Sequence, residues 1–212
     1  MIFAAVVLFG AIGQPPTAHA TPASDTQAIL DGLSIKGRAP KTGYSRSQFG
    51  DAWSDDASVL FGHNGCDTRN DILRVQLADV VIKPNTNECV VASGVLNDPY
   101  TGTTVEFLRG PGSSDDVQID HLVALSDAWQ TGAQQLDEVS RRNFANDPLN
   151  LQATLGHVNQ EKGDSDAASW LPPNSAYRCT YVTRIVNVKA AYGLWVTQAE
   201  HDAITWVLST DC

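Results

Sequence analysis

Basic residues are scarce in this chain of 212 residues. It has 14 lysines and arginines against 24 aspartates and glutamates, so its formal net charge at pH 7 is -10. An acidic protein gains no long-range attraction to polyanions. The charge therefore argues against a high-affinity nucleic-acid-binding protein, but not against an enzyme that holds a few phosphates transiently.

Long apolar runs and several catalytic signatures are also missing. After the first twenty residues no segment is long and apolar enough to span a bilayer. No HExxH, GxSxG or catalytic-cysteine pattern occurs, so nothing supports a protease or an esterase of those classes. A metal-dependent hydrolase of another ester stays open at this point.

The first twenty residues, MIFAAVVLFGAIGQPPTAHA, resemble a secretory signal peptide. An apolar stretch is followed by a Pro-Pro break and by the ending Ala18-His19-Ala20, which predicts cleavage after Ala20. No lysine or arginine precedes the apolar stretch, which departs from the usual pattern, and an uncleaved amino-terminal anchor is the alternative. With cleavage, we expect a secreted protein in which residues 21–212 form a single domain.

The four cysteines are an even number in an exported chain, which favours two disulfides. Three pairings are possible. We favour Cys66 with Cys89 and Cys179 with Cys212, because each closes a local loop and the second ties down the carboxyl terminus. A zinc site is the alternative, although no CxxC spacing occurs.

Apolar periodicity and capping residues predict an α+β protein. Helices are expected at 21–34 with Ser24 as N-cap, at 68–77 after Asp67, from 127 after Ser126, at 135–144, at 154–162, at 174–192 and after the capping box that begins at Thr197. Strands are expected at 89–96, 103–108, 117–121 and 150–153. Phe49 and Trp53 in FGDAWSDD are interpreted as a core anchor and a solvated turn.

The stretch VQIDHLV brings an acid and an imidazole together at the end of a predicted strand. Val117 and Ile119 share one face of this strand. Asp120 and His121, being neighbours, point to opposite sides, so a common site needs either a bend or a cation on one side and the nucleophile on the other. An imidazole can take a proton from water near neutral pH, whereas carboxylate and amide oxygens suit magnesium.

The segments VQIDHLV, NDPLNLQA and HVNQEKGD together resemble the HNH, or ββα-metal, endonuclease superfamily. The closest resemblance is to exported bacterial HNH proteins and to the carboxyl-terminal nuclease domain of GmrSD-type restriction systems. The motif covers about residues 117–166, and NGCDTRND, NDPYTG and the cysteine-containing end extend the resemblance over most of the chain. It implies a ββα-metal motif embedded in a small disulfide-tied α+β domain with flanking helices.

The resemblance also implies a role for each motif residue. His121 would be the general base that activates water, and Asp120 and Asn159 would bind one divalent cation. Asn150 would hold the strand that presents His121. Many members have histidine where this chain has Asn159, so zinc and manganese stay open, but oxygen ligands favour Mg²⁺.

Phosphate contacts are less defined in the sequence. Lys162 follows Asn159 closely and could lie near the substrate phosphate, or simply be a solvated lysine at a helix end. Arg69 could form an internal ion pair or hold a phosphate. The basic run at 36–46, KGRAPKTGYSR, is either a solvated loop or a phosphate-contacting one.

The sequence thus predicts a secreted, monomeric, metal-dependent endonuclease with nucleic acid, in the first place DNA, as substrate. The alternative is a non-catalytic exported binding domain that keeps the fold. The acidic charge favours the alternative, and the complete Asp-His-Asn-Asn set opposes it.

Overall fold

The computed structural model describes residues 22–212, and the predicted signal peptide lies outside this range. The helices are α1 (Pro22–Gly32), α2 (Thr68–Gln76), α3 (Leu125–Gln130), α4 (Glu138–Asn146), α5 (Gly156–Lys162), α6 (Ser175–Ala191) and α7 (Gln198–Thr210). The strands are β1 (Ala78–Ile82), β2 (Val91–Asn97), β3 (Thr104–Leu108), β4 (Val117–His121) and β5 (Leu151–Leu155). Short 3-10 helices are η1 (Arg46–Phe49), η2 (Ala133–Gln135) and η3 (Pro148–Asn150). The predicted α+β class is confirmed.

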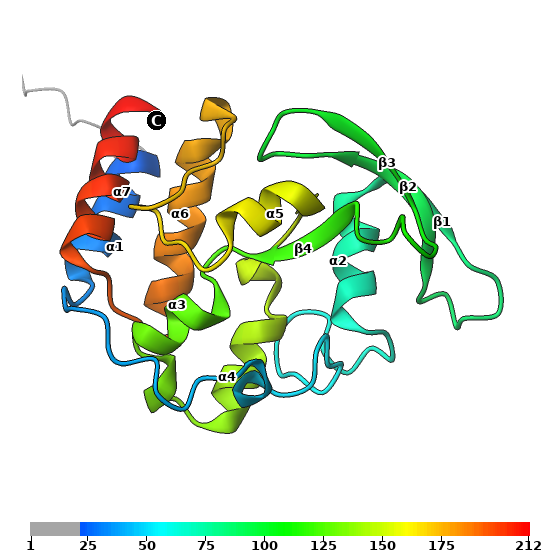
Figure 1. Cartoon of the computed structure of the whole chain (residues 1–212), viewed down its shortest axis with the longest axis horizontal. Coiled ribbons are helices and arrows are strands. Elements are labelled where there is room, and N and C mark those ends of the chain that lie inside the picture. Colours follow the sequence, from blue (N-terminus) through cyan, green and yellow to red (C-terminus); the bar gives the residue numbers. More distant parts are fainter. Residues whose placement is uncertain (1–21) are drawn as a thin grey trace, which may run out of the picture.

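The carboxyl-terminal helices and the larger sheet occupy opposite ends of the molecule. Figure 1 shows α1, α6 and α7 side by side at one end, the sheet of β1, β2 and β3 at the other, and β4 with α5 between them. The sheet is antiparallel with β2 in its middle, and β4 pairs with β5 in a separate two-stranded sheet. In the described part of the chain no helix has the length and apolar character needed to cross a membrane.

Two hydrophobic cores meet at the end of β4. Val117 and Ile119 pack with α2, β2 and β5 in the sheet-side core, as the alternation of this strand predicts. Leu122 and Val123, the next two apolar residues, belong instead to the core among the helices. The polar residues between these pairs therefore lie where the chain passes from one core to the other.

Both favoured disulfides are present. Cys66 is bonded to Cys89 and Cys179 to Cys212, so the first joins the loop before α2 to the chain entering β2, and the second ties the carboxyl terminus to α6. Because all four sulfurs are bonded in pairs, the alternative of a cysteine zinc site is wrong.

Several predicted helix starts are displaced. Helix α1 begins at Pro22, so Ser24 lies inside it rather than at its N-cap, and α3 begins after Ala124 rather than Ser126. Helix α5 starts at Gly156 and not at Thr154, because pairing of Leu155 with Val117 extends β5.

Other boundaries were predicted closely. Asp67 and Thr197 cap α2 and α7, with side chains that accept hydrogen bonds from Asn70 N and Glu200 N.

The strand β1 was not predicted, because the chain turns directly from α2 into it at Leu77 and offers no Gly or Pro signal there.

Candidate active site

His121 is the last residue of β4 and its ring is held on two sides. Its Nε2 lies 2.9 Å from the carbonyl oxygen of Ala145, at the end of α4. Its face stacks on Trp53, with ring centroids 5.7 Å apart and planes 9° from parallel. A carbonyl oxygen can only accept, so Nε2 must carry the ring proton of the neutral imidazole.

The other ring nitrogen, Nδ1, therefore carries no proton and has a free lone pair. It forms no hydrogen bond within residues 22–212 and is not one of the fully buried polar atoms that lack a partner, so solvent reaches it. Burial lowers the pKa of His121 to about 4, although the bond to Ala145 opposes this shift. The imidazole is consequently neutral at physiological pH and able to accept a proton.

Asp120 precedes His121 and points into different surroundings. The Tyr100 hydroxyl donates to its Oδ2 at 2.6 Å, and the Lys162 ammonium donates to its Oδ1 at 2.8 Å. Burial raises the pKa of Asp120, and Lys162 and Tyr100 oppose that shift. Since a carboxylate offers about four lone-pair directions, each oxygen can still accept one further ligand.

Lys162 is placed differently from the substrate-phosphate role considered for it. Its side chain is fully buried at the end of α5, and its ammonium also donates to the carbonyl oxygen of His121 at 2.8 Å. A buried ammonium with two acceptors holds the Asp120–His121 corner together. It does not reach a phosphate in solvent, so Lys162 is corrected to an internal ion-pair partner.

Asn159 lies in the middle of α5 and lines the same site. Its side-chain Nδ2 donates to Gln118 Oε1 at 2.9 Å, which turns the amide and leaves its oxygen without a hydrogen bond in the described chain. That oxygen is not among the fully buried unpaired atoms. It is available to a cation or to water.

Asn150 is fully buried beside the segment that follows β4. Its Oδ1 accepts from Val123 N at 2.9 Å and its Nδ2 donates to Val123 O at 3.3 Å. Its own carbonyl oxygen accepts from Leu122 N at 2.8 Å. These bonds extend the β4–β5 pairing past His121, which is the placement expected of a residue that braces the strand.

A polar pocket opens beside these residues, with a volume of about 210 Å³. We call it the site pocket. It is lined by Arg46, Ile119, Asp120, His121, Ala124, Leu125, Asn159, Gly163 and Asp164. Asp120 and His121 contact different neighbours yet both line this pocket, and β4 pairs with β5 in regular register through both residues.

The site pocket contains few metal-binding groups. Within residues 22–212 no three His, Cys, Asp or Glu side chains are arranged around a common point for an ion. A cation here would take its protein ligands from Asp120 and Asn159 and complete its shell with water. Mg²⁺ is commonly held in this way, by one or two carboxylates and several waters.

Arg69 is remote from the site pocket. Its guanidinium is largely buried and donates to the carbonyl oxygens of Ser114 and Val117, at 3.0 and 2.9 Å. Within residues 22–212 it forms no ion pair, and these two bonds engage its guanidinium inside the fold. Arg69 instead ties α2 to the start of β4.

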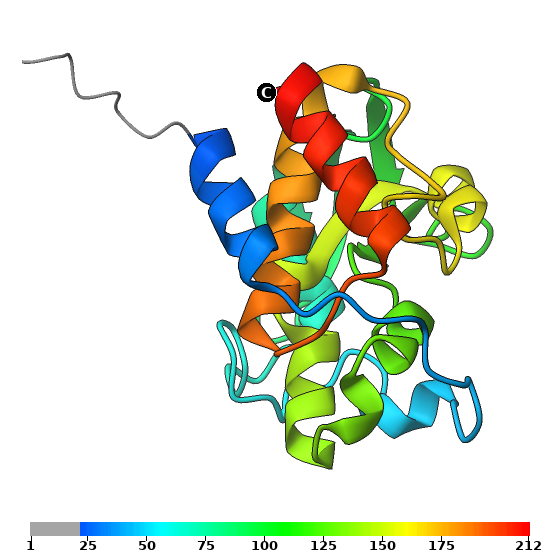
Figure 2. The same cartoon turned by 90° about the vertical axis from the view of Figure 1, so that its left-hand side faces the viewer.

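The basic run that was predicted as a loop forms a strap, residues 35–45, across the molecule. Figure 2 shows it running from the end of α1 past the start of α7 towards α3. Backbone hydrogen bonds from Lys36 to Val196 and from Ala39 to Gln130 fix it. Lys41 pairs with Asp164 at 3.1 Å, and Arg38 also pairs with acids, so two of the four basic side chains of the run are engaged in ion pairs.

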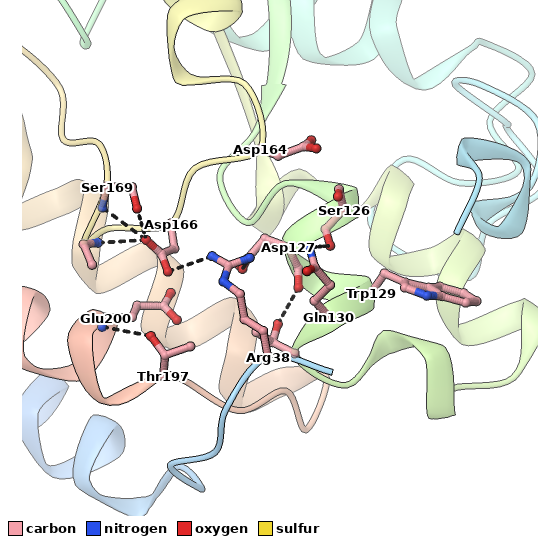
Figure 3. Close-up of polar contacts among 12 residues, drawn as sticks. Arg38, Ser126, Asp127, Trp129, Gln130, Asp164, Asp166, Ser169, Thr197 and Glu200 are labelled. Carbon is pink, nitrogen blue, oxygen red and sulfur yellow. Dashed lines mark hydrogen bonds and ion pairs between the residues drawn. The ribbon is translucent and has the colours of Figure 1, made fainter. Parts of the chain in front are cut away.

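A buried group of charges anchors the strap. Arg38 reaches Asp127 at 3.0 Å and Asp166 at 2.8 Å, as Figure 3 shows. Lys189, beneath them, pairs with Asp127 at 3.3 Å and with Glu200 at 2.7 Å. Three acids and two cations thus lie together, and burial raises the pKa of Glu200 to about 7.

Three further residues lie at the site, and only Arg46 belongs to a segment for which a phosphate contact was considered, the basic run at 36–46. Arg46, delivered by the end of the strap, lines the site pocket, is exposed, and forms no hydrogen bond or ion pair within the described residues. Trp53, interpreted as part of a solvated turn, stacks on His121, and Tyr100 bonds Asp120. The basic run around Arg46 was a usable signal; nothing local marks the other two.

Comparison with known proteins identifies relatives but no matching solved structure. Residues 67–207 match the family model described as GmrSD restriction endonucleases, C-terminal domain. A protein of Arthroderma benhamiae, described as an uncharacterized secreted protein, is 36% identical over 212 residues, covering 99% of this chain and 96% of its own length. No solved structure matches.

The relative and the disulfides agree on the compartment. Disulfides persist in oxidising, extracellular environments, and the relative is described as secreted, so the chain is a secreted protein.

The family match includes β4, β5 and α5, which carry the site pocket. The chain belongs to the family of GmrSD restriction endonuclease C-terminal domains, an HNH-type nuclease family.

Proposed function

We propose that the protein is a metal-dependent endonuclease that hydrolyses phosphodiester bonds of nucleic acid, with DNA as its substrate and His121 as its general base. One observation carries the proposal: Nε2 of His121 is committed to the Ala145 carbonyl, Nδ1 keeps its lone pair, and His121 lines one pocket together with Asp120 and Asn159. Family membership supports the reaction class.

His121 would take a proton from the attacking water on Nδ1. The imidazolium formed in this step is stabilised on two sides, since Nε2–H still donates to Ala145 and the ring lies against the face of Trp53. Its position is maintained by Asn150, which holds Val123, and by Lys162, which bonds the His121 carbonyl. General-base catalysis of this kind contributes roughly 10²–10⁴-fold.

HNH-type families generally use a divalent cation, and the residues of this site fit one. Asp120 keeps free lone pairs on both carboxylate oxygens, and the Asn159 amide oxygen has no other partner in the described chain. A cation held there would neutralise charge on the phosphate and on the departing 3′ oxygen. Because both donors are hard oxygens, we propose Mg²⁺, with Mn²⁺ accepted and Zn²⁺ a poorer fit.

Arg46 would contact the substrate phosphate. It replaces Lys162 and Arg69 in this role, because it is the exposed cation of the site pocket and both of the others are engaged inside the fold.

The test compares residues 21–212 with the variants His121→Ala and His157→Ala on supercoiled plasmid in Mg²⁺, with and without EDTA. We expect the wild type to nick the plasmid and EDTA to stop the nicking. The nicking rate should fall by at least about 100-fold in His121→Ala and change little in His157→Ala, whose side chain is exposed and lines a different pocket. Plasmid cleavage by His121→Ala at the wild-type rate would show that the mechanism is wrong.

Calorimetric titration with Mg²⁺ separates the enzyme from the alternative of a non-catalytic binding domain. The enzyme should take up one cation, Asp120→Ala should abolish that uptake, and His121→Ala should keep it. Absence of both cleavage and cation uptake would favour the binding domain.

A further inference from the structure

A second pocket adjoins the site pocket and differs from it in chemistry. We call it the side pocket; its volume is about 260 Å³. It is lined by Arg46, Ser47, Phe49, Gly50, Asp51, Ala52, Trp53, His121, Leu125 and Ala145. The two pockets share Arg46, His121 and Leu125, so a ligand that fills one lies directly beside the other.

Apolar and aromatic groups dominate the side pocket. Trp53 and Phe49 come from the segment after the strap, and Leu125 and Ala145 from α3 and α4. Pockets for drug-sized ligands have volumes of about 300–1,000 Å³. The side pocket is somewhat smaller, which suits a single planar ring system rather than a whole nucleotide.

Trp53 is held in its place at a conformational cost. Its φ is +58°, a region that bulky L-residues rarely adopt, and its carbonyl oxygen accepts from Thr68 N at 3.2 Å. Backbone strain of this kind clusters at active sites and ligand clamps. Here the conformation keeps the indole parallel to His121, at the border of the two pockets.

The charge of the protein limits how else a nucleic acid could be held. Its net charge is -10, and the strap's Arg38 and Lys41 are engaged with acids. Phosphate contacts are therefore few, whereas stacking of bases on aromatic side chains adds affinity without needing positive charge.

We infer that the side pocket binds one unstacked nucleobase of the nucleotide next to the scissile phosphate, with Trp53 on its wall and Arg46 between base and phosphate. This inference rests on the proposed function and adds the substrate class. A base inside a duplex is paired and stacked and must leave the helix to enter such a pocket. Single-stranded or locally unpaired nucleic acid is consequently the preferred substrate.

The test uses an end-labelled single-stranded oligonucleotide that carries a central block of abasic nucleotides. The abasic nucleotides are the tetrahydrofuran analogue, which keeps the phosphodiester backbone and cannot undergo β-elimination, and cleavage sites are mapped on a sequencing gel. We expect cleavage within the abasic block to fall by about tenfold or more relative to the flanks, from the worth of one stacked base. The same sequence as a duplex should be cleaved more slowly than as a single strand.

Variants of Trp53 test whether this side chain causes the difference in cleavage between the abasic block and its flanks. Trp53→Ala should remove the difference between block and flanks, Trp53→Phe should retain most of it, and the control Trp206→Ala, at an exposed position on α7, should behave as wild type. Far-UV circular dichroism confirms that each variant is folded. Uniform cleavage through the abasic block by the wild-type protein would overturn the inference while leaving the nuclease function intact.

A binding measurement covers the case in which no oligonucleotide is cleaved, which would refute the proposed function itself. Deoxyadenosine 5′-monophosphate should then quench tryptophan fluorescence in the wild type and in Trp206→Ala, but not in Trp53→Phe. Lack of quenching in the wild type would overturn the base pocket as well.

Discussion

Replacing Lys162 by methionine tests whether this lysine is an internal partner of Asp120 or a contact for substrate. Methionine keeps the length of the stem and removes the ammonium. Both acceptors, Asp120 Oδ1 and the His121 carbonyl oxygen, lose their donor at 2.8 Å, and the Asp120 carboxylate stays in a place where only 3% of the residue is exposed. Removing one partner of a buried ion pair costs about 3–5 kcal/mol of unfolding free energy.

The double variant Asp120→Asn/Lys162→Met separates charge from packing. It removes both charges, and the amide oxygen introduced in place of the Asp120 carboxylate can still accept from Tyr100, so the double variant should be more stable than Lys162→Met alone. We expect a coupling energy of about 2 kcal/mol, within the range for residues in contact. The exposed Lys83→Met is the control and should change stability by less than about 0.5 kcal/mol.

The assay is equilibrium unfolding in urea at pH 7, followed by tryptophan fluorescence, with the disulfides intact. Midpoint and slope are both recorded, so that a change in stability is distinguished from a change in the surface exposed on unfolding. A Lys162→Met protein as stable as wild type, whose KM for DNA rises at unchanged stability, would refute the internal ion pair and restore the phosphate contact.

Two further predictions concern the strap and its anchor. Arg46→Gln should raise KM for DNA by about tenfold or more, as expected for loss of a charge-assisted bond to phosphate, and Arg46→Lys should raise it less. The melting temperature should not change, because the Arg46 side chain is exposed. Steady-state kinetics measure KM, and a wild-type KM in both variants would contradict the assignment. Glu200→Gln should flatten the dependence of stability on pH. Burial raises the pKa of Glu200 to about 7 from 4.5, so the folded state gains from the protonated acid and the wild type loses stability as pH rises from about 4.5 through 7. Melting temperatures between pH 5 and pH 8 measure this, with the exposed Glu106→Gln as control; equal slopes in wild type and Glu200→Gln would refute it.

Local features of the sequence were enough to predict most of the elements around the site. Alternation placed Val117 and Ile119 in one core, Asp67 and Thr197 marked two helix starts, and cysteine spacing indicated both disulfides. Each of these depends on residues close together in the chain, where periodicity and capping chemistry act directly.

The exact limits of β5 and α5 were not predictable in the same way. Thr154 resembles a helix start, yet its hydroxyl donates to Asp98 at 2.8 Å, and its neighbour Leu155 pairs with Val117. Pairing with a strand from elsewhere in the chain decided where the helix begins, which a local capping preference of about 1 kcal/mol cannot outweigh.

The sequence by itself determined the candidate residues for the proposed chemistry: Asp120 and His121 at a strand end, and Asn150 and Asn159 at spacings that resemble a nuclease motif. Only the tertiary structure decided how their neighbours are used. It buries Lys162 against Asp120, stacks Trp53 on His121, and delivers Arg46 to the pocket through a strap anchored by Arg38. The reason is physical: whether a cation becomes a buried partner or an exposed contact depends on what packs over it, and those atoms come from segments far away in the chain.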